Sequence, residues 1–336
     1  MAFNNGKWKD GTAGNDVFDM GLQAFWDVAD NYRAGAGNDT VKGNVADNVI
    51  EGGSGRDTID GGWGNDTIYG GLDGDTLRGD LGQDWIYGGA GNDTIDGGND
   101  ADHLYGGDNT DVIHGGDGDD FVYGENGADT LYGDLGNDTL DGGWGADALY
   151  GGDGNDKLYD GSTENVADVM SGGDGNDRLE SRGGGDSLSG GAGSDTISIS
   201  NATIFQGLGG TISGGSGTDT VVLRDTTDVN DFSFMSSIEK FDLETSSNQT
   251  LRLDFNEVRT LSGTDQIAVY GEAGDRLFLQ DDVPGDSLDG GSWSAGPVSN
   301  PDSTGERYQT YQYLDLAGDF TGISVTVDTA VDVFLV

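Results

Sequence analysis

The chain has 336 residues, with 62 acidic against 15 basic side chains and a formal net charge of −47. A chain this acidic is a poor partner for nucleic acid and for anionic membrane surfaces, and the absence of cysteine excludes disulfides and thiolate metal sites. With 64 glycines and only 33% hydrophobic residues, the composition alone would suggest disorder.

Residues 1–33 are predicted to form an irregular N-terminal cap. The segment GTAGNDVFD (11–19) is an imperfect copy of a nine-residue unit that becomes regular further on, and Asp16 occupies its sixth position. Phe25 and Trp26 are apolar side chains that could cover the open end of the first regular unit. The opening residues MAFNNGKWKDG lack the apolar stretch of a Sec signal peptide, and no run reaches transmembrane length, so neither a Sec leader nor membrane insertion is expected.

From residue 34 to residue 159 the chain divides without a slip into 14 nonapeptides. Typical copies are GGSGRDTID (52–60), GGWGNDTIY (61–69) and GGDGNDKLY (151–159). The sixth position is Asp in 13 copies and Asn48 in the other, and the eighth is Val, Ile or Leu in all 14. A period this strict predicts a solenoid.

Each nonapeptide predicts a turn followed by a short strand. Strand side chains alternate between faces, so position 8 should point inward and positions 7 and 9 outward. The preceding Gly-Gly-x-Gly-x-Asp can curl through positive φ until several carbonyls converge, and its Asp adds a carboxylate. Such hard oxygen ligands suit Ca²⁺. Burying one aliphatic side chain contributes about 2–3 kcal/mol, whereas ordering each of nine residues costs about 1–2 kcal/mol. We therefore expect metal binding to drive folding.

The pattern GGxGxDxUx, in which U is a large aliphatic residue, resembles the nonapeptide of the RTX (repeat-in-toxin) family. The resemblance implies an all-β fold, a right-handed parallel β-roll in which two nonapeptides form one coil and Ca²⁺ lies between successive turns. It also implies that turn carbonyls and the sixth-position side chains are the ligands. These side chains are Asp39, Asn48, Asp57, Asp66, Asp75, Asp84, Asp93, Asp102, Asp111, Asp120, Asp129, Asp138, Asp147 and Asp156, of which Asn48 departs from the family pattern.

After residue 159 the count breaks. Residues 160–171 fit one repeat enlarged by a three-residue loop, regular spacing resumes at residue 172, and residues 199–213 are irregular. The last regular copy is GGSGTDTVV (214–222), so the predicted roll spans 34–222. Further candidate calcium ligands are Asp168, Asp177, Asp186, Asp195 and Asp219, together with Asp16 of the N-terminal cap.

The composition changes again over residues 223–336, which contain all three prolines. The alternating segments 251–255, 267–269, 277–279 and 323–327 predict antiparallel strands of a C-terminal β domain. Residues 237–311 resemble the C-terminal domain of many RTX exoproteins, and the terminal DVFLV resembles a type I secretion signal. The resemblance implies that the type I secretion machinery exports an unfolded chain, which then folds outside the cell, where calcium is abundant.

Residues 18 apart should lie on the same face of the roll, in strands that stack at about 4.8 Å. One face then carries a contiguous aromatic patch made of Trp85, Tyr87, His103, Tyr105, Phe121 and Tyr123. Two interpretations stay open. Aromatic residues suit strands and stack on their neighbours, but a large exposed apolar patch is also typical of an interface.

The opposite face carries a row of mostly threonine, a pattern that invites an ice-binding interpretation. The row is Thr40, Thr58, Thr76, Thr94, Val112, Thr130 and Ala148. Its companion row is charged and irregular: Lys42, Asp60, Arg78, Asp96, His114, Tyr132 and Tyr150. This companion row favours ordinary solvent-facing threonine over ice binding.

No catalytic constellation is evident in the sequence. His103 and His114 fall at positions that face opposite sides of the roll, and there is no HExxH motif. We therefore expect a secreted calcium-binding protein, extracellular or at the cell surface, that is not an enzyme. A structural, surface-layer, matrix or adhesive self-assembly role is favoured. The alternative is an accessory module that binds a polysaccharide or another partner through the aromatic patch.

Overall fold

The computed structural model describes the solenoid almost completely and the C-terminal part in separate strands. The described residues are 8–19, 31–161, 166–200, 209–224, 235–243, 250–254, 266–271, 276–280, 292–298, 308–314, 320–328 and 331–335. They form strands and turns, with no helix in any of these ranges, and so none of them offers an apolar helix that could span a bilayer.

The chain divides into two compact units. The first comprises Met1–Glu164 and Asp168–Asp174, and the second comprises Asn165–Ala167 and Gly175–Val336. The predicted capping residues Phe25 and Trp26 lie outside the described residues.

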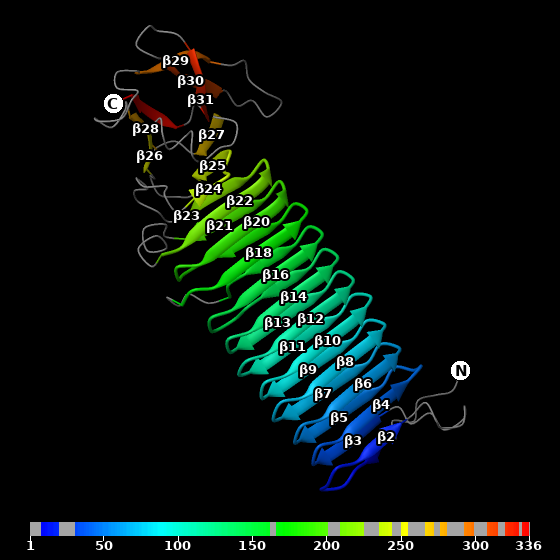
Figure 1. Ribbon diagram of the computed structural model, residues 1–336. Coiled ribbons are helices and arrows are strands. Elements are labelled where there is room, and N and C mark those ends of the chain that lie inside the picture. Colours follow the sequence, from blue (N-terminus) through cyan, green and yellow to red (C-terminus); the bar gives the residue numbers. More distant parts are fainter. Residues whose placement is uncertain are drawn as a thin grey trace. The chain divides into compact units, whose positions relative to one another are not determined.

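The first unit is a parallel β-solenoid built from two stacks of strands (Figure 1). Odd-numbered strands form one stack: β1 (Trp8–Asp10), β3 (Asn31–Ala36), β5 (Val49–Ser54), β7 (Thr67–Leu72), β9 (Trp85–Ala90), β11 (His103–Asp108), β13 (Phe121–Asn126), β15 (Thr139–Asp141) and β17 (Lys157–Tyr159). Even-numbered strands form the other: β2 (Val17–Asp19), β4 (Thr40–Asn44), β6 (Thr58–Trp63), β8 (Thr76–Leu81), β10 (Thr94–Asn99), β12 (Val112–Asp117), β14 (Thr130–Leu135), β16 (Ala148–Asp153) and β18 (Val169–Asp174).

The register confirms that two nonapeptides make one coil. Each strand pairs in parallel with the strand two along, so that Ile95 opposes Ile113 and Leu104 opposes Val122, both 18 residues apart. Only the first coil is longer, because Val17 opposes Thr40, 23 residues further on.

The strands are longer than the sequence pattern predicts. Most contain six residues, which cover positions 7–9 of one repeat and 1–3 of the next, so the turn shrinks to positions 4–6. The leading glycines therefore belong to the strands, as in the pairing of Gly71 with Gly89. Their lack of a side chain lets neighbouring coils approach closely: an added Cβ on Gly98 would lie 2.3 Å or so from the carbonyl oxygen of Asp80.

The core of the solenoid is a column of aliphatic side chains at position 8. From Ile50 through Ile95 to Leu158 these side chains are at most 1% exposed, which confirms the predicted inward face. Since each coil contributes only two such side chains, the apolar core is narrow.

The second unit continues as parallel strands and ends in an antiparallel group. One series pairs in parallel: β19 (Arg178–Ser181), β21 (Thr196–Ser200), β23 (Thr220–Arg224), β25 (Lys240–Leu243), β27 (Gln266–Gly271) and β31 (Phe320–Asp328). A second series contains β20 (Ser187–Gly193), β22 (Thr211–Gly217) and β24 (Met235–Ser236). A third contains β26 (Thr250–Asp254), β28 (Arg276–Gln280) and β32 (Asp332–Leu335).

Antiparallel pairing is confirmed, but only where β30 (Tyr308–Leu314) joins β29 (Ser292–Val298) and β31. The four segments from which antiparallel strands were predicted form β26, β27, β28 and β31, and these pair with one another in parallel. Alternation reports which residues face inward, not the direction of the neighbouring strand, which explains the difference.

Truncating one core side chain should test the narrow column. Replacing Ile95 by Ala is expected to lower the free energy of unfolding by about 2–5 kcal/mol, because the coils above and below cannot close the cavity. Urea denaturation in saturating calcium, followed by circular dichroism, measures this. The matched control is the outward-facing Thr94→Ala, expected to stay within about 0.5 kcal/mol of the parent. Equal losses for both variants would contradict the inward placement of position 8.

Candidate calcium sites

The sixth-position aspartates form two buried rows along the solenoid. One row lies in the turns that lead into the even-numbered strands and the other in the turns that lead into the odd-numbered strands. From Asp39 to Asp156 these side chains are at most 2% exposed. Within each row, one carboxylate oxygen accepts a hydrogen bond from the coil before it: Asp57 N–H donates to Asp75 Oδ1 at 2.8 Å, and Asp84 N–H donates to Asp102 Oδ1 at 2.7 Å.

The second carboxylate oxygen is buried without a hydrogen-bond donor among the described residues. This holds for Oδ2 of Asp39, Asp57, Asp66, Asp75, Asp84, Asp93, Asp102, Asp111, Asp120, Asp129, Asp138, Asp195 and Asp219. Burying a carboxylate with an unsatisfied oxygen is strongly unfavourable unless a positive charge compensates for it. The rows therefore require cations or protons.

These oxygens point at hollows that glycine leaves open. A Cβ added to Gly97 would lie 2.5 Å from Asp102 Oδ2 and 2.6 Å from the carbonyl oxygen of Gly115 in the next coil. Gly70 has the same surroundings, with Asp75 Oδ2 at 2.5 Å. A carboxylate oxygen and a backbone carbonyl from adjacent coils thus converge on one point, which is the donor chemistry that Ca²⁺ prefers.

Burial also makes the carboxylates reluctant to ionise. It raises the pKa of Asp102 to about 8 and the pKa of Asp66, Asp75 and Asp84 to about 7, while the backbone N–H bond lowers each pKa and neighbouring carboxylates raise it further. The same causes raise the pKa of other members of the rows: Asp111, Asp129 and Asp138 to about 7, and Asp120, Asp156 and Asp195 to about 6.

Comparison with known proteins gives the same assignment as the oxygen chemistry. A family model described as the RTX calcium-binding nonapeptide repeat matches overlapping segments that together cover half of the chain: 28–59, 42–77, 69–104, 105–140, 123–158, 141–166 and 163–197. The chain belongs to the RTX calcium-binding repeat family. No curated protein matches it. Calcium is the cofactor of this family, and the regular rows of buried aspartate fit several ions. The bound ion supplies the positive charge that the paired oxygens lack.

Asn48 is the one amide in the RTX rows of the first unit. Its backbone N–H donates to Asp66 Oδ1 at 2.7 Å, as an aspartate would, so the row continues through it. Its own Oδ1 accepts the N–H of Asn44 at 3.1 Å. An amide brings no negative charge, so this turn offers a calcium ion one charge fewer than its neighbours do.

At two other candidate ligands the chain itself occupies the oxygen that is unsatisfied elsewhere. Asp16 Oδ2 accepts hydrogen bonds from Thr12, at 2.6 Å from the N–H and 2.9 Å from the hydroxyl. Asp186 Oδ2 accepts the Ser181 hydroxyl at 2.5 Å, and Ser181 stands where most repeats have their first glycine.

The remaining candidates also take their places in the rows. In the first unit, Asp147 N–H donates to Asp168 Oδ1 at 2.8 Å. In the second unit, Asp177 N–H donates to Asp195 Oδ1 at 2.8 Å, and Asp195 N–H donates to Asp219 Oδ1 at 2.9 Å.

Sequence analysis missed Glu239, which continues the row in the second unit. Its Oε2 accepts the N–H of Asp219 at 2.9 Å, as the aspartates do further back. The available signal was its spacing, since Glu239 precedes the buried Phe241 by two residues, just as the sixth position precedes the eighth. The 20-residue step from Asp219 and the longer side chain concealed it.

The predicted aromatic patch is a double stack on the odd-numbered strands. Tyr69, Tyr87, Tyr105 and Tyr123 stack with ring centroids 4.9–5.0 Å apart. Beside them, His103 lies 4.1 Å from Trp85 and 4.9 Å from Phe121. The ring faces thus contact one another, and a partner role for this patch remains a prediction.

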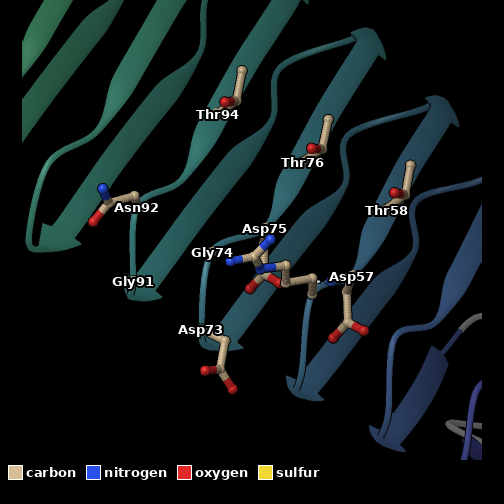
Figure 2. Close-up of a pocket in the computed structure, with 10 residues that line it drawn as sticks. Asp57, Thr58, Asp73, Gly74, Asp75, Thr76, Gly91, Asn92 and Thr94 are labelled. Atoms are coloured by element: carbon tan, nitrogen blue, oxygen red, sulfur yellow. Dashed lines mark hydrogen bonds between the residues drawn. The ribbon is translucent and has the colours of Figure 1, made fainter.

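The opposite face combines threonine with ion pairs. Figure 2 shows Thr58, Thr76 and Thr94 in register beside the turns that hold Asp57 and Asp75, where they line a hollow of about 670 Å³. In the companion row, Lys42 pairs with Asp60 and Arg78 pairs with Asp96, each at 3.0 Å. Such alternating charges do not make the flat, uncharged surface that ice binding suggests.

The raised pKa values predict how the calcium-free chain responds to pH. A folded-state pKa near 7 against an unfolded value near 3.8 means that the folded state binds more protons between these values. The free energy of unfolding therefore falls as the pH rises through this window. Far-UV circular dichroism in metal-depleted buffer should show more strand at pH 5 than at pH 8. A strand signal that grows with pH would contradict the buried, unpaired state of these carboxylates.

Filling one hollow should disrupt one calcium site. Gly97→Ala places a methyl group against Asp102 Oδ2 and the Gly115 carbonyl, so we expect a loss of about 1–3 kcal/mol in stability and a higher calcium concentration at the folding midpoint. The control is Gly14→Ala, since a Cβ there has nothing within 4 Å. Calcium titrations followed by circular dichroism compare the two. An unchanged midpoint for Gly97→Ala would show that no ion uses this hollow.

Proposed function

We propose that calcium folds this chain outside the cell and that the folded roll has a structural role, as a surface-layer or matrix subunit or as a self-assembling adhesive. The observation that carries the proposal is the double row of buried aspartate oxygens without donors. A chain with so many uncompensated carboxylates is unstable as a folded solenoid at neutral pH until cations enter the rows. The ions thereby become a condition of folding.

Export fits the same physics. Cytosolic calcium is too low to fill sites of extracellular affinity, about 10⁻⁴–10⁻³ M, so the chain would stay unfolded for a type I exporter and fold once outside. The terminal residues proposed as a secretion signal form β32, which pairs in parallel with β28. The signal would therefore be read before folding and built into the second unit afterwards.

The placement of the reactive side chains supports a role other than catalysis. His103 is stacked between Trp85 and Phe121 on the odd-numbered strands, while His114 lies beside Asp134 on the even-numbered strands. The two histidines therefore share no site, and the carboxylates are already committed to the rows.

The alternative function is an accessory module that binds a partner through the aromatic patch. Trp85 and Phe121 are about 40% exposed although they are large and apolar. Side chains of this kind at the surface are typical of interfaces.

One titration tests the proposal and separates it from the alternative. In EDTA at neutral pH we expect a largely unfolded far-UV circular dichroism spectrum, and in excess calcium a strand spectrum. Light scattering over the same titration should show growing particles for an assembly subunit and a constant monomer for a binding module. Magnesium at equal concentration is the control. A strand spectrum already complete in EDTA at neutral pH would refute calcium-driven folding.

A further inference from the structure

Three acidic residues of the first unit occupy a backbone conformation that favours glycine. Most repeats have glycine at the second position with positive φ, for example Gly107 at 115°. Asp80, Glu125 and Asp134 replace it and keep a left-handed φ of 73°, 73° and 71°. Side chains other than glycine are strained there, and such strain persists where the side chain has a use.

Two of these three acids have a basic partner on their own sheet. Asp80 Oδ1 lies 3.7 Å from Arg78 Nε, and Asp134 Oδ2 lies 2.9 Å from His114 Nδ1. Glu125 differs from both, because its exposed carboxylate makes no hydrogen bond or ion pair with any residue that the structure describes. The chain thus supplies a strained carboxylate without a counterion.

Glu125 stands between two hollows beside the tyrosine stack. One, of about 270 Å³, is lined by Tyr87, Tyr105 and Asp108 along with Glu125 itself. The other, of about 380 Å³, adds Trp144, whose side chain is 61% exposed. No lysine or arginine lines either hollow among the described residues. We call these two hollows together the Glu125 groove.

The chemistry of the groove selects among ligands. A neutral sugar stacks on aromatic ring faces, but the faces of Tyr87 and Tyr105 already contact each other and their neighbours. A calcium ion prefers a shell of oxygens, whereas here aromatic rings form much of the wall. An ammonium or guanidinium group on an alkyl stem satisfies both features, because its charge pairs with carboxylate and its stem packs on rings.

We propose that the Glu125 groove binds a lysine or arginine side chain presented by a basic segment of a partner protein. The net charge of −47 attracts such a partner from a distance, and the groove gives the attraction a defined location. This inference rests on the proposed function, because the groove exists only in the calcium-folded roll.

The test measures binding of fluorescein-labelled hexalysine to the full-length protein in saturating calcium by fluorescence anisotropy. Glu125→Gly restores the usual glycine, so it should fold at least as well as the parent and yet raise Kd about fivefold, the loss of roughly one ion pair. The matched control is Asp134→Gly, which removes the same charge from the same strained position on the other sheet. Its Kd should stay within about twofold of the parent.

Each outcome decides the proposal. It stands if only Glu125→Gly weakens binding and if acetylated, uncharged hexalysine fails to compete. It is overturned by equal effects of both variants, by absence of binding to the folded parent, or by equal competition from neutral cellohexaose. A lower number of bound calcium ions in Glu125→Gly would assign the groove to calcium and also overturn it. Circular dichroism before each titration reports whether calcium folds the chain, so a failure of the proposed function is recognised separately.

Discussion

The structure depends on compensating the charge of carboxylate oxygens that the fold buries in rows. Each sixth-position aspartate uses one oxygen to accept an N–H from the neighbouring coil, as Asp75 does from Asp57, and this bond helps to hold the coils together. The other oxygen faces a hollow that contains only further oxygen atoms. Carboxylates stacked at about 4.8 Å repel one another in a poorly solvated turn. The same arrangement that joins the coils would therefore separate them if no cation were bound.

Glycine is the second constraint, and it follows from the first. At the first position of the repeat the hollow must stay open for the ion, and at the second position neighbouring backbones approach too closely for a Cβ. Exceptions to glycine therefore carry information. Ser181 fills its hollow and donates its hydroxyl to Asp186, whereas Asp134 and Glu125 carry carboxylates out to the surface at a conformational cost.

The outward faces are free of these constraints, and they are where the molecule acquires individuality. Because coils repeat every 18 residues, any outward position becomes a row of evenly spaced side chains. One face uses this spacing for stacked tyrosines such as Tyr87 and Tyr105, and the other uses it for threonines and for ion pairs such as that of Lys42 with Asp60. A scaffold of this kind suits recognition or assembly along a line better than the enclosure of a substrate.

The sequence by itself determined the period, the two-repeat coil, the inward column at position 8 and the burial of the sixth-position aspartates. These features could be predicted because they recur: the same local pattern of glycine, aspartate and aliphatic residue appears in every repeat, and period 2 of a strand then assigns the faces. Only the tertiary structure decided the features that depend on an unequal neighbour. The strands lengthen to six residues because glycines of adjacent coils pair, and β26 and β28 align in parallel although alternation cannot report direction. Glu239 enters the row through a 20-residue step, and Glu125 remains without a partner because no basic side chain of the coils around it reaches its groove. Contacts between coils set these outcomes, and they involve residues whose spacing or side-chain length departs from the repeat.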